Sequence, residues 1–203
     1  MKELLTWPVK IVPDATITSY QIISNPVEKV HYVYVRPDQP LDEYQLSHEL
    51  AHAVLAERVH PAFAGVGLSR ELERSRRKRH LATTAYRVAT EWFVDELRYQ
   101  HHPESERKEL LELISHPETL RLIAEHEPFS LGLLCAEARR WLGVEVEHPL
   151  VDVFLEVDPA QPSLGALVRL INRLLEVRGS KLRCRIDTEK GVPVLKERST
   201  TPG

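Results

Sequence analysis

Cysteine is scarce in this chain of 203 residues, and long apolar runs are absent. The two cysteines, Cys135 and Cys184, are too few for a disulfide framework, so a reducing compartment is expected. No apolar run approaches the ~20 residues of a membrane span, and the first residues lack the apolar core of a signal peptide. We therefore expect a cytoplasmic protein with no membrane partner.

An excess of one charge is also missing. The formal net charge is −3 and the pI is near 6.4, which gives no overall reason to expect a nucleic-acid partner. The stretch from Arg70 to His80 is basic, but Glu71 and Glu73 interrupt it and no aromatic residues accompany it. Such a stretch is more typical of a solvated helix face than of a nucleic-acid surface.

The hydrophobic pattern predicts an α+β protein that is mostly helical, with a small antiparallel β-element near the N-terminus. Strands are expected at 9–12, 16–24 and 30–35. The expected helices span 41–59, 69–100 (as one helix or two), 104–115, 117–125, 130–142 and 163–178. The range 151–157 is ambiguous, and 182–187 with 192–195 should form a short hairpin. We expect a catalytic domain over 1–102, a helical region over 103–196 and a disordered tail over 197–203.

One motif carries chemistry: the H-E-x-x-H sequence of His48, Glu49 and His52. On a helix, residues four apart share a face, so both imidazoles can reach one ion. Glu49 would lie beside that ion rather than on it, where a base for an activated water is needed. The motif therefore predicts a metal site with a catalytic glutamate.

A third ligand is expected, because catalytic zinc usually has three protein ligands. Glu91 and Asp95 lie four residues apart on the apolar part of the second long helix. Like charges at this spacing disfavour a helix, and burial adds to the cost. A cation bound by Glu91, with Asp95 accepting the N–H of a ligating histidine, would resolve both problems. The alternative is a surface ion-pair ladder with Arg87 and Arg98.

H-E-x-x-H followed by E-x-x-x-D resembles the gluzincin class of zinc metallopeptidases, which includes thermolysin. The resemblance covers about residues 30–100. It implies that His48, His52 and Glu91 bind Zn2+, that Glu49 is the general base and that Asp95 supports the first histidine. It also implies that a strand before the helix pairs with an extended peptide or protein substrate. The residues in that position are Val30, His31, Tyr32, Val33, Tyr34 and Val35.

Other zinc peptidase groups fit less well. The third histidine of metzincins would fall on Arg58, and His60 is two residues too far along the chain. The small intracellular ImmA/IrrE peptidases also place a strand before H-E-L-x-H, but their E-x-x-A-N-x-F pattern would put its ligand on Arg87. Because the metzincin and ImmA/IrrE patterns both fail, the general gluzincin resemblance is preferred. It too has a departure, since the thermolysin pattern has asparagine where this chain has Thr90.

Two functions of different class follow from the sequence. The first is a zinc metallopeptidase. The second is a non-catalytic zinc-binding regulatory or partner-binding protein that keeps the same fold, and the presence of Glu49 favours the first. Residues 103–203 carry no recognised motif, so substrate choice and oligomeric state are left open.

Overall fold

The computed structural model describes residues 1–198, apart from the side chains of residues 126 and 128, and it confirms a mostly helical α+β protein. The chain divides into two units. The first contains Met1–Arg70 and Arg185–Lys196, and the second contains Glu71–Cys184 with Glu197 and Arg198. The boundary expected after residue 102 differs from this division.

The first unit carries the N-terminal β-element and the helix of the metal motif. Strand β3 matches its predicted range, whereas β2 begins five residues later than expected. The elements are η1 (Lys2–Leu4), β1 (Val9–Pro13), β2 (Gln21–Asn25), β3 (Val30–Val35), α1 (Glu43–Arg58), η2 (Pro61–Ala64) and β4 (Gly67–Leu68).

Strand β3 is the centre of a three-stranded sheet. It pairs antiparallel with β2, as expected for a small antiparallel β-element. It also pairs in parallel with β1, the strand expected at 9–12, and the parallel direction was not predicted. Both edges of β3 are therefore occupied by backbone hydrogen bonds. A substrate strand therefore cannot pair with the edge of residues 30–35, and that expectation is wrong. The edge strands of this sheet are β1 and β2.

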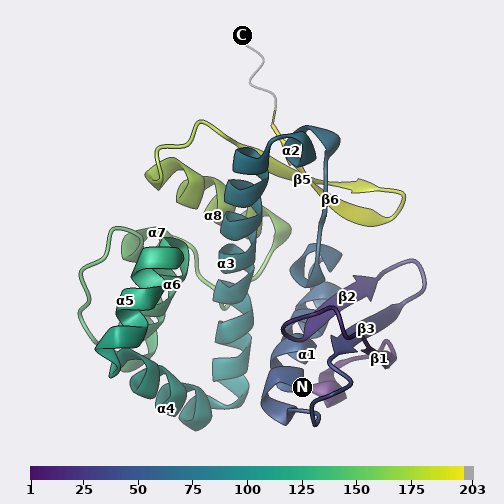
Figure 1. Cartoon of the computed structure of the whole chain (residues 1–203), viewed down its shortest axis with the longest axis horizontal. Helices are drawn as coiled ribbons and strands as arrows, with labels where there is room; N and C mark the ends of the chain where they lie inside the picture. Colours follow the sequence, from purple (N-terminus) through teal and green to yellow (C-terminus); the bar gives the residue numbers. More distant parts are fainter. Residues whose placement is uncertain (199–203) are drawn as a thin grey trace. The chain divides into compact units, whose positions relative to one another are not determined.

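Helix α1 packs on one face of this sheet (Figure 1). Asp42 is its N-cap, and its carboxylate accepts from the backbone N–H groups of Tyr44 and Gln45. Small residues of α1 lie against buried side chains of β2 and β3, which brings the helix close to the sheet. This core consists of Tyr20, Ile22, Val33, Val35, Ala53, Ala56 and Ala64.

The predicted C-terminal hairpin is formed by β5 (Cys184–Glu189) and β6 (Val192–Glu197). Lys190 and Gly191 both have positive φ, the backbone conformation of a two-residue type I′ turn. Strand β6 also pairs in parallel with the short strand β4. Beyond Arg198, the tail expected over 197–203 lies outside the described residues, and Glu197 belongs to β6.

The second unit is helical. The long helical range splits at Ser75, which caps the second part by accepting from the N–H of Lys78. Gly143 and Gly179 follow their helices with positive φ, as expected for C-terminal glycines. The elements are α2 (Arg70–Arg74), which begins at the last residue of the first unit, α3 (Arg76–His101), α4 (Pro103–Ile114), α5 (Pro117–His126), α6 (Pro128–Glu137), a π-helical turn (Ala138–Leu142), α7 (Val151–Leu155) and α8 (Leu164–Val177).

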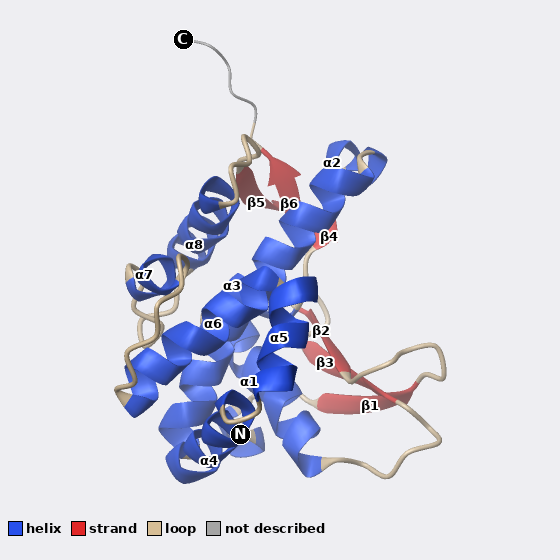
Figure 2. Ribbon diagram, turned by 60° about the vertical axis from the view of Figure 1, so that its left-hand side comes forward, coloured by secondary structure: helices blue, strands red, loops and turns tan. Residues whose placement is uncertain are grey.

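The buried stripe of α3 explains why this helix belongs to the second unit. Trp92 and Phe93 are almost fully buried, and Trp92 donates its indole N–H to the carbonyl of Val157. Helix α3 packs along α8, whose Leu167, Ile171 and neighbouring apolar residues are fully buried (Figure 2). Within the described residues, no helix combines the length and apolar character needed to cross a bilayer.

Candidate metal centre

His48 and His52 lie on consecutive turns of α1, as the motif predicts. Their Nε2 atoms are 3.3 Å apart. Two nitrogen ligands of a tetrahedral zinc ion lie about 3.3 to 3.4 Å apart, because Zn–N distances are about 2.0 to 2.1 Å. The spacing of the two rings therefore fits one shared ion.

The other nitrogen of His52 has a defined partner. Nδ1 lies 2.7 Å from the backbone carbonyl oxygen of Phe63, which can only accept, so Nδ1 carries the hydrogen. The Nε2 lone pair is then directed away from this bond, as a metal ligand requires. Phe63 belongs to η2, which lies outside the helices and strands expected from the sequence. No side-chain pattern could have identified it, because the acceptor is a backbone atom.

Glu49 occupies the next position of α1 and is buried, with 8 % of its surface exposed. Its carboxylate is thus largely removed from bulk water. Its catalytic role remains a prediction.

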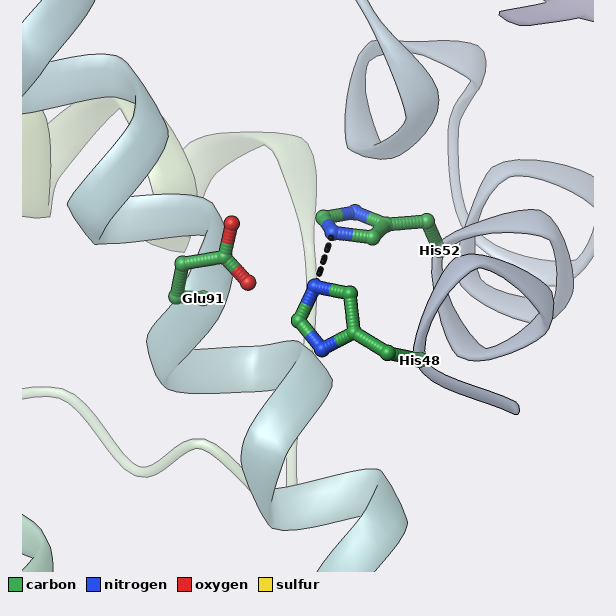
Figure 3. Close-up of side chains that lie close together, drawn as sticks. All are labelled: His48, His52 and Glu91. Atoms are coloured by element: carbon green, nitrogen blue, oxygen red, sulfur yellow. Dashed lines mark hydrogen bonds between the residues drawn. The ribbon is translucent and has the colours of Figure 1, made fainter. Parts of the chain in front are cut away.

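Glu91 comes from α3 and joins the two histidines in one group. The ligand atoms of His48, His52 and Glu91 all lie within 4.8 Å of one another, and this group could hold a metal ion (Figure 3). Two imidazoles and a carboxylate are a common donor set for transition metals.

The alternative expected for Glu91 and Asp95, a surface ladder with two arginines, is only partly present. Arg87 forms an ion pair with Glu127 rather than following the helix toward Glu91. Arg98 does approach Asp95, at 3.5 Å, but Arg98 itself is buried. The acids of α3 therefore belong to a buried polar group, not to a solvated ladder.

That buried group extends to two residues, Glu106 and Glu137, that were not selected from the sequence. Arg98 forms a 2.8 Å ion pair with Glu106 of α4. Glu137, at the end of α6, is 7 % exposed and hydrogen bonds to the side chain of Asp95. One signal was present in the sequence: Glu137 follows an almost entirely apolar run from Phe129 to Ala136.

Burial raises the pKa of Glu137 well above its usual range, and the negative charges of Asp95 and Glu91 raise it further. Glu137 is therefore the protonated member of the pair and can donate to the Asp95 carboxylate. The bond holds Asp95 in place from the side of α6.

The residues expected to contact substrate, 30–35, are mostly buried in the first unit. Val30, Val33 and Val35 are core residues, and only Tyr32 and Tyr34 are half-exposed. His31 is fully buried: its Nδ1 lies 2.7 Å from the Ser24 hydroxyl and its Nε2 lies 3.2 Å from a Glu57 oxygen. His31 therefore connects β2 and α1 inside the first unit and is not available to a substrate.

Glu57, on the last turn of α1, ties the N-terminal segment to the helix. Its carboxylate accepts from the backbone N–H groups of Thr6 and Trp7, from the Thr6 hydroxyl and from His31. Burial raises the pKa of this carboxyl, but the hydrogen bonds from Thr6, Trp7 and His31 outweigh it and lower the pKa to about 2.

Comparison with known proteins adds no relatives. No protein family matches the chain, and neither the curated proteins nor the solved structures contain a significant match. Its function therefore has to be inferred from the site itself.

Proposed function

We propose that this protein is a zinc-dependent metallopeptidase. The observation that carries the proposal is the histidine pair of α1, whose Nε2 atoms are separated by the distance of two ligands on a tetrahedral zinc ion. The identity of the metal rests on this spacing and on the His, His, Glu donor set.

His48, His52 and Glu91 would hold the ion. Phe63 fixes His52 through its carbonyl, which leaves His48 as the imidazole for Asp95 to support. Glu137 and Arg98 in turn hold Asp95. Both proposed histidine ligands thus have a neighbour that sets their orientation or the orientation of their support.

The chemistry supplied by a bound zinc ion is a lowered pKa of water, to about 7, and polarisation of a carbonyl oxygen. Glu49 takes the proton of the attacking water and passes it to the leaving amine of the peptide. Its low exposure places the carboxylate away from bulk water, where few other water molecules compete for the proton.

The test compares zinc content and peptide hydrolysis in the same preparations. The wild type is expected to contain about one zinc per chain and to cleave casein or a quenched peptide library. A chelator should abolish cleavage, and added zinc should restore it. Glu49→Gln should keep the zinc and reduce cleavage by at least ~100-fold, the usual contribution of a general base.

The matched control is Glu43→Gln, an exposed glutamate in the first turn of the same helix, which should retain full cleavage. Zinc binding without any cleavage would support the non-catalytic zinc-binding protein instead. Zinc binding is tested with a dye that reports the free metal. If the wild type binds no zinc, both the metallopeptidase and the non-catalytic zinc-binding protein are contradicted.

A further inference from the structure

The first two turns of α3 carry a cluster of cations that the metal centre does not use. Arg76, Arg77 and Arg79 are exposed, and His80 and Thr83 lie on the same side of the helix as Arg76 and Arg79. These five residues, Arg76, Arg77, Arg79, His80 and Thr83, are called the basic surface below. They line a hollow of about 690 Å³.

The charges of the three arginines in this surface are not neutralised by ion pairs with described residues. Lys78, which points elsewhere, has an ion pair with Glu197. In the part of the chain that the structure describes, Arg76, Arg77 and Arg79 form no ion pair. Three guanidinium groups on little more than one helical turn therefore repel one another.

Their position on the helix adds to this repulsion. They stand in the first turn of a helix of 26 residues, and that turn contains no acid. The N-terminal end of a helix carries a positive partial charge, so cations are disfavoured there and anions are favoured. A bound anion would offset both the repulsion among the arginines and their repulsion from the helix N-terminus. The hollow provides space for such an anion.

The side chains that line the hollow match phosphate in particular. Arginine donates two parallel hydrogen bonds to phosphate, and a histidine N–H can donate a further one. The Thr83 hydroxyl donates to the backbone carbonyl of Arg79 and only lines the hollow. The eight residues from Arg76 to Thr83 span about 10 Å of helix, roughly the length of three phosphates at a rise of 3.4 Å per nucleotide. We propose that the basic surface binds the phosphodiester backbone of a nucleic acid.

A bilayer is a weaker fit to the same surface. Binding to an anionic membrane usually adds an apolar face to the cations, and none of the exposed large apolar residues of the described chain lies between Arg70 and Thr83. Phenylalanine, tyrosine and tryptophan are also absent from the hollow, so it has no platform on which successive bases stack. Binding should therefore depend on phosphate and be nearly independent of sequence.

The experiment measures fluorescence anisotropy of a labelled 20-nucleotide DNA strand and of its duplex with the full-length protein. If three phosphates are contacted, raising salt from 50 to 200 mM should weaken binding about 20-fold for the strand and about 40-fold for the duplex. The triple variant Arg76→Gln, Arg77→Gln, Arg79→Gln should bind at least ~10-fold more weakly at 50 mM salt, with little salt dependence.

The matched control removes the same amount of charge elsewhere, with Lys108→Gln, Arg169→Gln and Lys181→Gln at exposed positions of the same unit. It should bind within about 2-fold of the wild type, and circular dichroism should show equal helicity for all three proteins. Equal weakening in both triple variants, or no saturable binding at 50 mM salt, would overturn the proposal. Equally tight binding of a polyglutamate of the same charge would also overturn it, because phosphate would then not be recognised.

Discussion

His52 and Phe63 are joined by a 2.7 Å hydrogen bond from the imidazole Nδ1 to the backbone carbonyl oxygen. The bond fixes the tautomer of His52 and directs Nε2 toward Nε2 of His48. Segment η2, which follows α1 directly, thus orients a proposed ligand on the helix before it. The geometry of the histidine pair is set by local structure of the first unit alone.

His52→Ala should reduce zinc affinity by more than ~100-fold, since even the loss of a hydrogen bond behind a ligand costs 10- to 100-fold. Chelator competition measures this directly. His116→Ala, at an exposed position outside the group, is the control and should leave the affinity unchanged. Similar affinity in His52→Ala and wild type would remove this residue from the site.

Glu91→Ala should likewise lose most of the zinc, because two imidazoles alone leave the ion with too few protein ligands. Elemental analysis of the purified protein gives the metal content. The control is Glu112→Ala, an exposed glutamate on α4. Equal zinc in wild type and Glu91→Ala is the result that argues against Glu91, whatever the histidine variants show.

The sequence was most informative where one local pattern decides the structure. The alternation from Val30 to Val35, the cap at Asp42 and the spacing of His48 and His52 each depend on a few neighbouring residues. The pairing of strands that lie far apart in the chain was harder to predict from the sequence. That β1 adds to β3 in parallel depends on contacts between distant segments, and this pairing removed the strand edge expected to bind substrate.

Glu137 shows the same limit at the candidate site. It lies 42 positions beyond Asp95 in the sequence, on a helix with no motif of its own. Only the packing of α6 on α3 brings the two carboxyl groups together. Side-chain chemistry identified the proposed ligands and Asp95, whereas Glu137, which holds Asp95, came from tertiary structure.

Glu57 should make the first unit sensitive to acid. Its pKa is about 2 in the folded chain and 4.5 ordinarily, so the folded state binds fewer protons than the unfolded state. The stability that it contributes is complete above pH 4.5 and is lost as the pH falls toward 2. Urea unfolding followed between pH 6 and pH 3 should show a decrease for the wild type.

Glu57→Gln should flatten this decrease and cost about 1 to 3 kcal/mol at pH 6, the usual effect of weakening hydrogen bonds to a buried carboxylate. Glu147→Gln, which changes an exposed glutamate, should keep the wild-type pH dependence. A steep acid transition in Glu57→Gln would falsify the assignment of this dependence to Glu57.

Glu137 should act in the opposite direction. Its pKa is raised by burial and by Asp95 and Glu91, so the folded state holds a proton that the unfolded state releases at neutral pH. In metal-free protein, the wild type should therefore gain stability relative to Glu137→Gln as the pH falls from 8 to 5. Glutamine keeps a hydrogen-bond donor for Asp95 without needing that proton.

Glu137→Leu separates this bond from simple filling of space. Leucine occupies the site but cannot donate, so the buried carboxylate of Asp95 loses a partner at a cost of about 1 to 3 kcal/mol. At pH 7, the free energy of unfolding should be larger for Glu137→Gln than for Glu137→Leu. Zinc affinity should follow the same order, because a displaced Asp95 no longer supports the ligand that it orients. If the leucine variant matched glutamine in both measurements, Glu137 would have no role beyond packing.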